Sequence, residues 1–213
     1  MKIYDISWPI TDKMTIVPGG TSPLFEPIKK FVPDEVRDSI IHMDAKSGTH
    51  VLAPSRLLRD GKTVDQISLA RLIGTTRLLD LTEVAGHIAA DDLKKQDIKE
   101  GDIVLLKTKN SSLDASAPFD KDFVALDTTA AEYLVEKKIR MIGFDYLMLG
   151  SDDKGVSPLK TLFENGITVV EGVRLFGVPH GVYFIFCLPL YVVGLEAAPA
   201  RAVLLDVSDQ INV

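Results

Sequence analysis

A histidine and a glutamate stand where enzymes often place groups that move protons. His50 lies in the segment Ser-Gly-Thr-His, directly after a glycine turn. Glu171 follows the apolar run 167–170, which is typical of a buried strand. The carboxyl end of such a strand is a common place for functional carboxylates in α/β folds. A structural hydrogen bond also explains either residue, so spacing alone leaves both interpretations open.

Charged neighbours of His50 favour the functional interpretation. His42, Asp44 and Lys46 occupy alternate positions of a predicted strand, so their side chains are expected to share one face. Arg56 follows shortly after His50. A lysine and an arginine beside a carboxylate and an imidazole have the residue types that bind a small acid and transfer protons.

Composition limits the classes of partner. The 213-residue sequence is 46% hydrophobic and 25% charged, which is ordinary for a globular chain with a sizeable core. Its formal net charge is −6, without a basic run, so we expect neither nucleic acid nor an anionic membrane as a partner.

Cysteine usage and the amino-terminal segment predict a cytoplasmic protein. Cys187 is the single cysteine and lies in the apolar run 182–190, where a buried, unreactive thiol is expected. The opening segment MKIYDISWPI lacks the apolar stretch of a signal peptide, and no run of apolar residues has the length of a membrane span.

Periodicity and turn residues predict a mixed α/β chain with more strand than helix, organised as one domain over residues 1–213. A loop rich in proline and glycine is expected at 18–27, and a buried strand before Asp145 suggests that this carboxylate bonds a nearby turn. Strands are expected at 3–6, 37–46, 76–80, 103–106, 141–144, 167–170, 182–190 and 202–207, and helices at 69–73, 90–95, 128–137 (capped by Thr128) and 158–165.

Several segments resemble, in order and spacing, the cyclase family, which includes bacterial kynurenine formamidases and isatin hydrolase. The resemblance implies a swivelling β/β/α domain with a mixed sheet and few helices, assembled as a homodimer or homotetramer. It also implies hydrolysis of an amide or lactone in a small cyclic or aromatic acid. The segments that carry it are IYDISWPITDKMTIVPGG, SGTHVLAPSRLLRDGKTVDQI, IKEGDIVLLKT, EYLVEKKIRMIGFDY, LFENGITVVEGVRL and FIFCLPLYVVGLEAAPARAVLLD.

The same resemblance shows that most of the family's metal-site positions are altered here. By this register, only His50 and Glu171 keep the family's residue type among the six positions Lys46, His50, Leu52, Arg56, Leu159 and Glu171. Leucine cannot donate to a metal, and protonated lysine and arginine repel a dication. We therefore predict no metal and no other cofactor. A shifted metal site built from His42, Asp44 and His50 remains a less favoured alternative, because Lys46 lies among them.

Two functions follow from these substitutions. In the first, the protein is a metal-independent enzyme whose catalytic residues are His50, Glu171, Lys46 and Arg56. Its substrate, a small molecule bearing a carboxylate, would contact Trp8, Phe25, Asp44 and Arg56. In the second, the protein is an inactive paralogue that binds a small molecule or serves as a structural protein. Its two cations then pair with Asp44 and Glu171.

Overall fold

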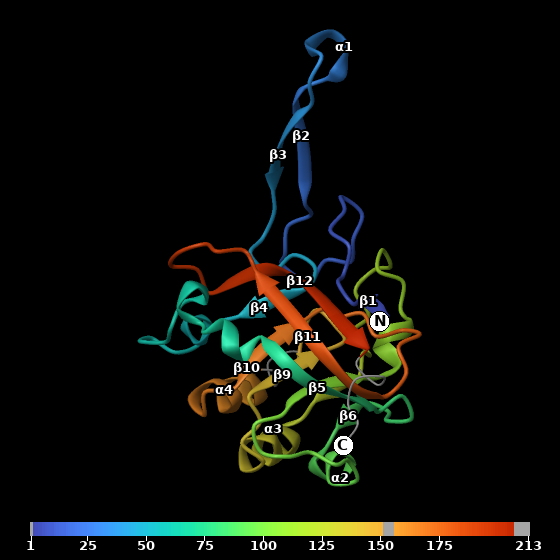
Figure 1. Ribbon diagram of the computed structural model, residues 1–213, viewed down its shortest axis with the longest axis vertical. Helices are drawn as coiled ribbons and strands as arrows, with labels where there is room; N and C mark the ends of the chain where they lie inside the picture. The colour runs from blue at the N-terminus through green and yellow to red at the C-terminus, as the bar shows by residue number, and fades with distance from the viewer. Residues whose placement is uncertain (1, 151–155, 207–213) are drawn as a thin grey trace.

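The computed structural model describes residues 2–150 and 156–206, whose main element is a sheet closed into a barrel (Figure 1). The strand order is β1-β12-β11-β5-β7-β9-β10-β4, and β4 pairs with β12 as well, which closes the ring. The pairs β5–β7, β7–β9 and β9–β10 are parallel, and the others are antiparallel. The strands are β1 (Ile3–Asp5), β4 (His50–Leu52), β5 (Ile73–Asp80), β7 (Ile103–Lys107), β9 (Met141–Phe144), β10 (Thr168–Glu171), β11 (Gly181–Pro189) and β12 (Ala197–Asp206).

Two hydrophobic cores lie on the two faces of this sheet. Successive side chains of a strand point to opposite faces. In β7, Ile103 and Leu105 therefore join the core inside the barrel, which also contains the buried Cys187. Val104 and Leu106 join the outer core, which packs under the helices. Those helices are α2 (Ala90–Leu93), α3 (Thr128–Glu136) and α4 (Val156–Glu164), grouped along one side of the barrel in Figure 1.

A two-stranded arm projects from the barrel (Figure 1). It consists of β2 (Leu24–Lys29), the short helix α1 (Phe31–Asp34) and β3 (Asp38–His42). The expected loop at 18–27 therefore contains a strand, and the expected strand at 37–46 ends at 42. The prediction that His42, Asp44 and Lys46 share one strand face is consequently wrong.

The remaining short elements connect the barrel strands. The expected helix at 69–73 is a single 3₁₀ turn followed directly by β5. The cap of α3 is Asp127 rather than Thr128, because the Asp127 carboxylate accepts a hydrogen bond from the backbone N–H of Ala130 at 2.8 Å. The short connecting elements are β6 (His87–Ile88), β8 (Ala125–Leu126), η1 (Pro54–Arg56), η2 (Val64–Gln66), η3 (Leu69–Arg71) and η4 (Lys109–Ser112).

The helices that the structure describes are short. The longest, α3 and α4, have 9 residues each. Within the described ranges, no helix combines the length and apolar character needed to cross a bilayer.

Candidate functional site

His50 and Glu171 face each other on neighbouring antiparallel strands. The register of β4 and β10 places them directly opposite. Nε2 of His50 lies 3.1 Å from Oε2 of Glu171, and the two side chains are 1% and 7% exposed. The other carboxylate oxygen, Oε1, accepts a hydrogen bond from the backbone N–H of Leu149 at 2.7 Å. The pair is therefore buried and held from three elements.

The backbone beneath this pair is fixed by two glycines and a threonine. Gly48 and Gly172 have φ of 65° and 75°, and a Cβ on Gly172 would lie 2.6 Å from the carbonyl oxygen of Gly48. The Thr49 hydroxyl donates to the carbonyl oxygen of Gly172 at 2.6 Å and accepts from the backbone N–H of Trp8 at 2.7 Å. The Gly-Thr-His segment thus locks β4 against the end of β10.

Hydrogen-bond chemistry defines the protons of the pair. Nδ1 of His50 lies 2.9 Å from the carbonyl oxygen of Gly48, which can only accept, so Nδ1 carries a hydrogen. The contact between Nε2 and Glu171 then needs one proton, held either by the imidazole or by the carboxyl group. The pair as a whole is neutral in both states and can pass a proton between nitrogen and oxygen.

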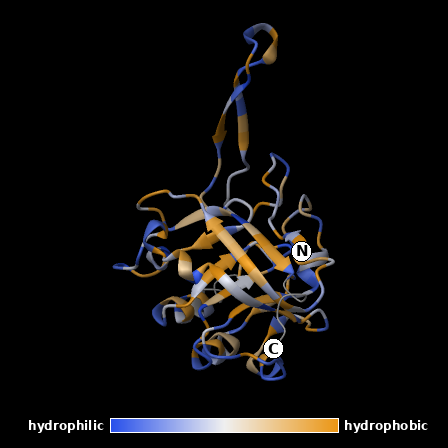
Figure 2. Cartoon of the chain, in the orientation of Figure 1, coloured by the Kyte–Doolittle hydropathy of each residue, from blue (hydrophilic) through white to orange (hydrophobic). Residues whose placement is uncertain are grey.

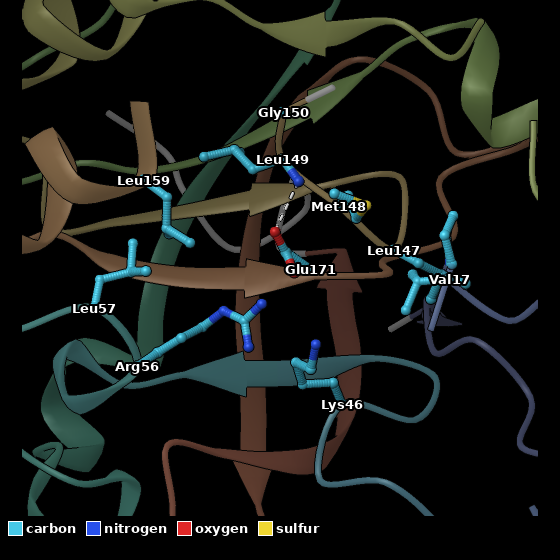
Figure 3. Close-up of a pocket in the computed structure, with 11 residues that line it drawn as sticks. Val17, Lys46, Arg56, Leu57, Leu147, Met148, Leu149, Gly150, Leu159 and Glu171 are labelled. Atoms are coloured by element: carbon cyan, nitrogen blue, oxygen red, sulfur yellow. Dashed lines mark hydrogen bonds between the residues drawn. The ribbon is translucent and has the colours of Figure 1, made fainter. Parts of the chain in front are cut away.

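A cavity of about 160 Å³ opens beside Glu171. Figure 3 shows Arg56, from η1, and Lys46, from the turn before β4, extending toward Glu171. Leu159 of α4 lines the same cavity. The full lining comprises Val17, Pro18, Lys46, Arg56, Leu57, Leu147, Met148, Leu149, Gly150, Leu159 and Glu171.

The two cations of this cavity have no counter-ion among the residues that the structure describes. No carboxylate oxygen in 2–150 or 156–206 lies within 4.0 Å of the Lys46 ammonium or the Arg56 guanidinium. Burial and the nearby Arg56 lower the pKa of Lys46 below 10.5, while Glu171 and Asp44 oppose that shift. The pairing with Asp44 and Glu171 that a decayed site would show is not formed. The cavity lining therefore contains two cationic side chains without an ion-pair partner in the described part of the chain.

The donor set at this site does not fit a divalent metal. Such ions need about three nitrogen, oxygen or thiolate donors. His50 and Glu171 are donors, whereas Leu159 offers none and the Lys46 and Arg56 side chains are cations. In the described part of the chain, no three His, Cys, Asp or Glu side chains cluster closely enough to hold an ion. This includes the alternative group of His42, Asp44 and His50.

The structure brings together only some of the predicted site residues. Lys46, Arg56 and Glu171 line the cavity, and His50 lies directly behind Glu171. Asp44 lies beside Lys46 at a small adjoining hollow, where its carboxylate accepts a hydrogen bond from the backbone N–H of Thr21 at 2.7 Å.

Three residues that were predicted at the site lie elsewhere. They are Trp8 and Phe25, predicted to contact the substrate, and His42, predicted to lie beside Lys46. Trp8 is 2% exposed and packs under Arg174, whose guanidinium lies 4.6 Å from the ring centroid. Phe25 lies on the arm, and so does His42, whose Nε2 contacts Glu26 at 3.1 Å. None of the three lines the cavity.

Sequence reasoning missed the backbone donor of the site. The N–H of Leu149 binds Glu171, and the segment from Leu147 to Gly150 forms one wall of the cavity. The contribution of Leu149 comes from a backbone amide, which every residue except proline has. Residue identity therefore gave no signal, and the buried strand 141–144 indicated only that a loop follows it.

Comparisons with known proteins identify relatives of the whole chain. The sequence pattern of the Cyclase family matches residues 4–150. A kynurenine formamidase from Bacillus anthracis is 31% identical over 205 residues, which cover 95% of this chain and 97% of that relative. A solved structure described as a potential metal-dependent hydrolase with cyclase activity has 40% sequence identity and a TM-score of 0.87, covering 95% of this chain and 96% of its own. An isatin hydrolase bound to thioisatinate has a TM-score of 0.82 at 18% identity, covering 95% and 91%, which shows a shared fold.

These findings define first a class and then a family. The strand-rich α/β barrel, with its few helices on one side, is the fold of cyclase-like hydrolases. The chain belongs to the cyclase family. The resemblance inferred from the sequence and the predicted fold class are both confirmed.

Proposed function

We propose that this protein is a cyclase-family hydrolase that cleaves an amide or lactone in a small cyclic or aromatic acid without a divalent metal. The observation that carries the proposal is the pair of cations, Lys46 and Arg56, at a cavity whose far wall is Glu171. Within the described chain neither cation has a carboxylate partner. Two fixed positive charges therefore stand beside the family's carboxylate.

The size of the cavity supports a substrate with one ring. A cavity of about 150 Å³ in another protein accommodates benzene, and the cavity beside Glu171 measures about 160 Å³. Leu57 and Leu159 supply apolar walls, and Arg56 offers a planar fork that can hold a carboxylate through two hydrogen bonds. A single-ring aromatic acid matches both the volume and the charge.

In the proposed hydrolysis, Glu171 of the buried pair accepts a proton and later returns it. The carboxylate of Glu171, held by Leu149 and backed by protonated His50, accepts a proton from the attacking water. The water oxygen bonds to the substrate carbonyl carbon, and Lys46 stabilises the oxyanion that forms. The same proton then passes to the leaving nitrogen or oxygen as the C–N or C–O bond breaks. Glu171 is thereby returned to its starting state.

A second function, a small-molecule binder without turnover, is favoured by one observation. Both oxygens of Glu171 already have partners in the chain, Nε2 of His50 and the N–H of Leu149. A carboxylate held in this way can serve simply to fix β10 against β4. The cations at 46 and 56 would then bind an acid and release it unchanged.

The two functions are separated by assaying purified protein with an N-formylated aminobenzoate and with an aromatic lactone that carries a carboxylate, each with and without a chelator. The proposal expects turnover that resists the chelator, in protein whose metal content is far below one ion per chain. Lys46→Met and Arg56→Met should each lower kcat/KM by about 10- to 100-fold, the worth of a charge-assisted hydrogen bond. Lys121→Met removes an exposed lysine that does not line the cavity and should leave turnover unchanged.

Three outcomes would contradict the proposal of a metal-independent hydrolase. Turnover that stops with chelator and returns with zinc or manganese would contradict metal independence. Full activity in both cavity variants would remove the role of the cations. Calorimetric binding of benzoate that requires Lys46 and Arg56, with no hydrolysis of either substrate, would establish the binder instead.

A further inference from the structure

Two adjoining cavities lie where η2 and η3 meet the carboxyl ends of α3 and α4. The smaller measures about 320 Å³ and the larger about 550 Å³. Arg71 and Ile167 line both, so the two form one continuous hollow, which we call the second pocket. Among the described residues, none lines both the second pocket and the cavity beside Glu171. The second pocket is therefore a separate candidate site.

Two arginines, Arg71 and Arg140, line the larger cavity of the second pocket. Both side chains are partly buried. No carboxylate oxygen of residues 2–150 or 156–206 lies within 4.0 Å of either guanidinium group. Nε of Arg140 is buried and has no hydrogen-bond partner in that part of the chain. An unused buried donor is costly in a folded protein, so this guanidinium group is suited to an acceptor that enters the cavity.

The chain fixes the position of both arginines. Nη1 of Arg71 donates a hydrogen bond to the carbonyl oxygen of Arg140 at 3.2 Å, which ties η3 to the residue before β9. Gly74, in β5, has a φ of 145°, and a Cβ at this position would lie 2.6 Å from Nη2 of Arg140. Glycine therefore leaves the space that the Arg140 guanidinium group occupies. The two cations are held against the backbone of the barrel.

Basic side chains near the carboxyl ends of helices often serve to bond the free carbonyl groups of the last turn. Here backbone N–H groups already bond such carbonyls. At the end of α4, Gly166 donates to the carbonyl oxygen of Phe163 at 3.0 Å. At the end of α3, Lys138 donates to the carbonyl oxygen of Val135 at 2.8 Å. Capping of these helices therefore does not account for the two guanidinium groups.

The smaller cavity of the second pocket is mostly apolar. Figure 2 shows the barrel strands as mainly hydrophobic, and Leu52 of β4 lines the cavity from that side. Phe163 of α4 lines it too, and the two side chains are 0% and 3% exposed. Glu164, the acidic residue of the lining, is paired with Lys160 at 3.8 Å. A cavity of about 150 Å³ accommodates benzene in another protein, so this larger volume has room for two fused rings.

We propose that the second pocket binds a phosphate monoester whose other part is an aromatic group. The guanidinium groups of Arg71 and Arg140 bind the phosphate oxygens, because their planar forks match this anion. A phosphate monoester carries roughly two negative charges and several acceptor oxygens at pH 7, more than a carboxylate offers to two arginines. The aromatic group lies in the smaller cavity, against Leu52 and Phe163. This site is independent of the hydrolysis proposed at Glu171.

Calorimetric titration of the full chain with naphthyl phosphate tests this proposal. Its two fused rings exceed the cavity beside Glu171, which matches one ring, so this probe reports on the second pocket. The Kd should lie below about 1 mM and be at least about tenfold lower than for inorganic phosphate or naphthol, each of which uses only half of the pocket. Arg71→Met and Arg140→Met should each weaken binding by about 10- to 100-fold, the worth of a charge-assisted hydrogen bond.

Two controls separate this site from the rest of the molecule. The double variant Lys46→Met with Arg56→Met removes the cations beside Glu171 and should bind naphthyl phosphate as the wild-type protein does. Arg37→Met changes an exposed arginine of the arm, outside the second pocket, and should also bind unchanged.

Circular dichroism verifies that each variant is folded. Arg71→Lys and Arg140→Lys keep the charge but not the planar fork, and they should bind the probe more weakly than the wild-type protein and more tightly than the methionine variants. The proposal is overturned if naphthyl phosphate does not bind below about 1 mM, or if folded arginine variants bind it as the wild-type protein does. Equal affinity for inorganic phosphate or naphthol would overturn it as well. Loss of binding in the double variant would place the probe beside Glu171 instead.

Discussion

Two buried carboxylates stand at the ends of adjacent parallel strands and have opposite surroundings. Asp145 directly follows β9, and Glu171 ends β10. Asp145 accepts hydrogen bonds from the backbone N–H groups and hydroxyls of Thr108 and Ser111, and burial raises the pKa of this carboxyl. Glu171 has two partners and borders a cavity with two cations. Asp145 and Glu171 both stand at the end of a strand. The groups around each carboxylate therefore determine which of the two can act on a ligand.

The largest expected effect falls on the enclosed carboxylate. Asp145→Ala should lower the free energy of unfolding by about 3–5 kcal/mol, because it leaves several buried donors of the Thr108–Ser111 turn without an acceptor. Urea denaturation measures this loss. Asp145→Asn, which keeps one acceptor oxygen and the volume, should lose clearly less. A loss below about 1 kcal/mol for the alanine variant would mean that Asp145 does not anchor the turn.

Two substitutions of Glu171 should have different effects on stability and on activity. Glu171→Leu strands the N–H of Leu149 and the imidazole of His50, so the free energy of unfolding should fall by about 2–3 kcal/mol. Glu171→Gln can bond both groups and should cost less than about 1 kcal/mol, yet it removes the proton acceptor. Denaturation and turnover are compared for the two variants. Turnover retained by the glutamine variant would refute the assigned role of Glu171.

Ligand binding should depend on pH through the lysine. Burial and Arg56 lower the pKa of Lys46 below 10.5, so the ammonium loses its proton at lower pH than an exposed lysine does. The affinity for benzoate should therefore fall, by about tenfold, as pH rises through that lowered pKa. Calorimetry at increasing pH measures the fall. Lys46→Arg stays charged, so its affinity for benzoate should change little with pH. If this variant shows the same pH dependence as the wild-type protein, Lys46 does not contribute to ligand binding.

The smallest expected effect is a gain in stability. A lysine whose pKa is lowered in the folded state destabilises that state below the lowered pKa, and the penalty fades as pH rises toward 10.5. Lys46→Met should therefore raise the free energy of unfolding at pH 7 by about 0.5 kcal/mol, a modest figure because water screens this partly exposed group. Near pH 10 the difference should be smaller. A loss of stability at pH 7 would mean that Lys46 has a partner in the folded protein.

Apolar runs and turn residues predicted most of the barrel from the sequence. Strands such as β7 and β9 are continuous apolar segments bounded by polar turns, which is typical of parallel strands buried on both faces. The arm was not predicted as a hairpin. Its first strand contains proline, and its apolar residues do not mark a core, so periodicity alone gave no sign that it leaves the body.

The site was predictable in part. The types of His50 and Glu171 marked them as candidates, but their direct opposition depends on the register of β4 and β10, which are far apart in the sequence. The position of Lys46 was assigned to a strand that in fact ends at His42. Trp8 was expected at the ligand because it is aromatic, whereas its ring stacks under Arg174 in the interior. Long-range packing determines these placements.

The double pairing of β4 has a consequence for how the site can be changed. This strand of 3 residues is buried throughout and is bonded along one edge to β10 and along the other to β12. Side chains at 46 and 56 flank the strand rather than support it. We therefore expect β4 and its two neighbouring strands to tolerate different residue types at positions 46 and 56. Replacing Lys46 and Arg56 with residues that donate to a metal would change the chemistry of the cavity and leave the barrel fold intact.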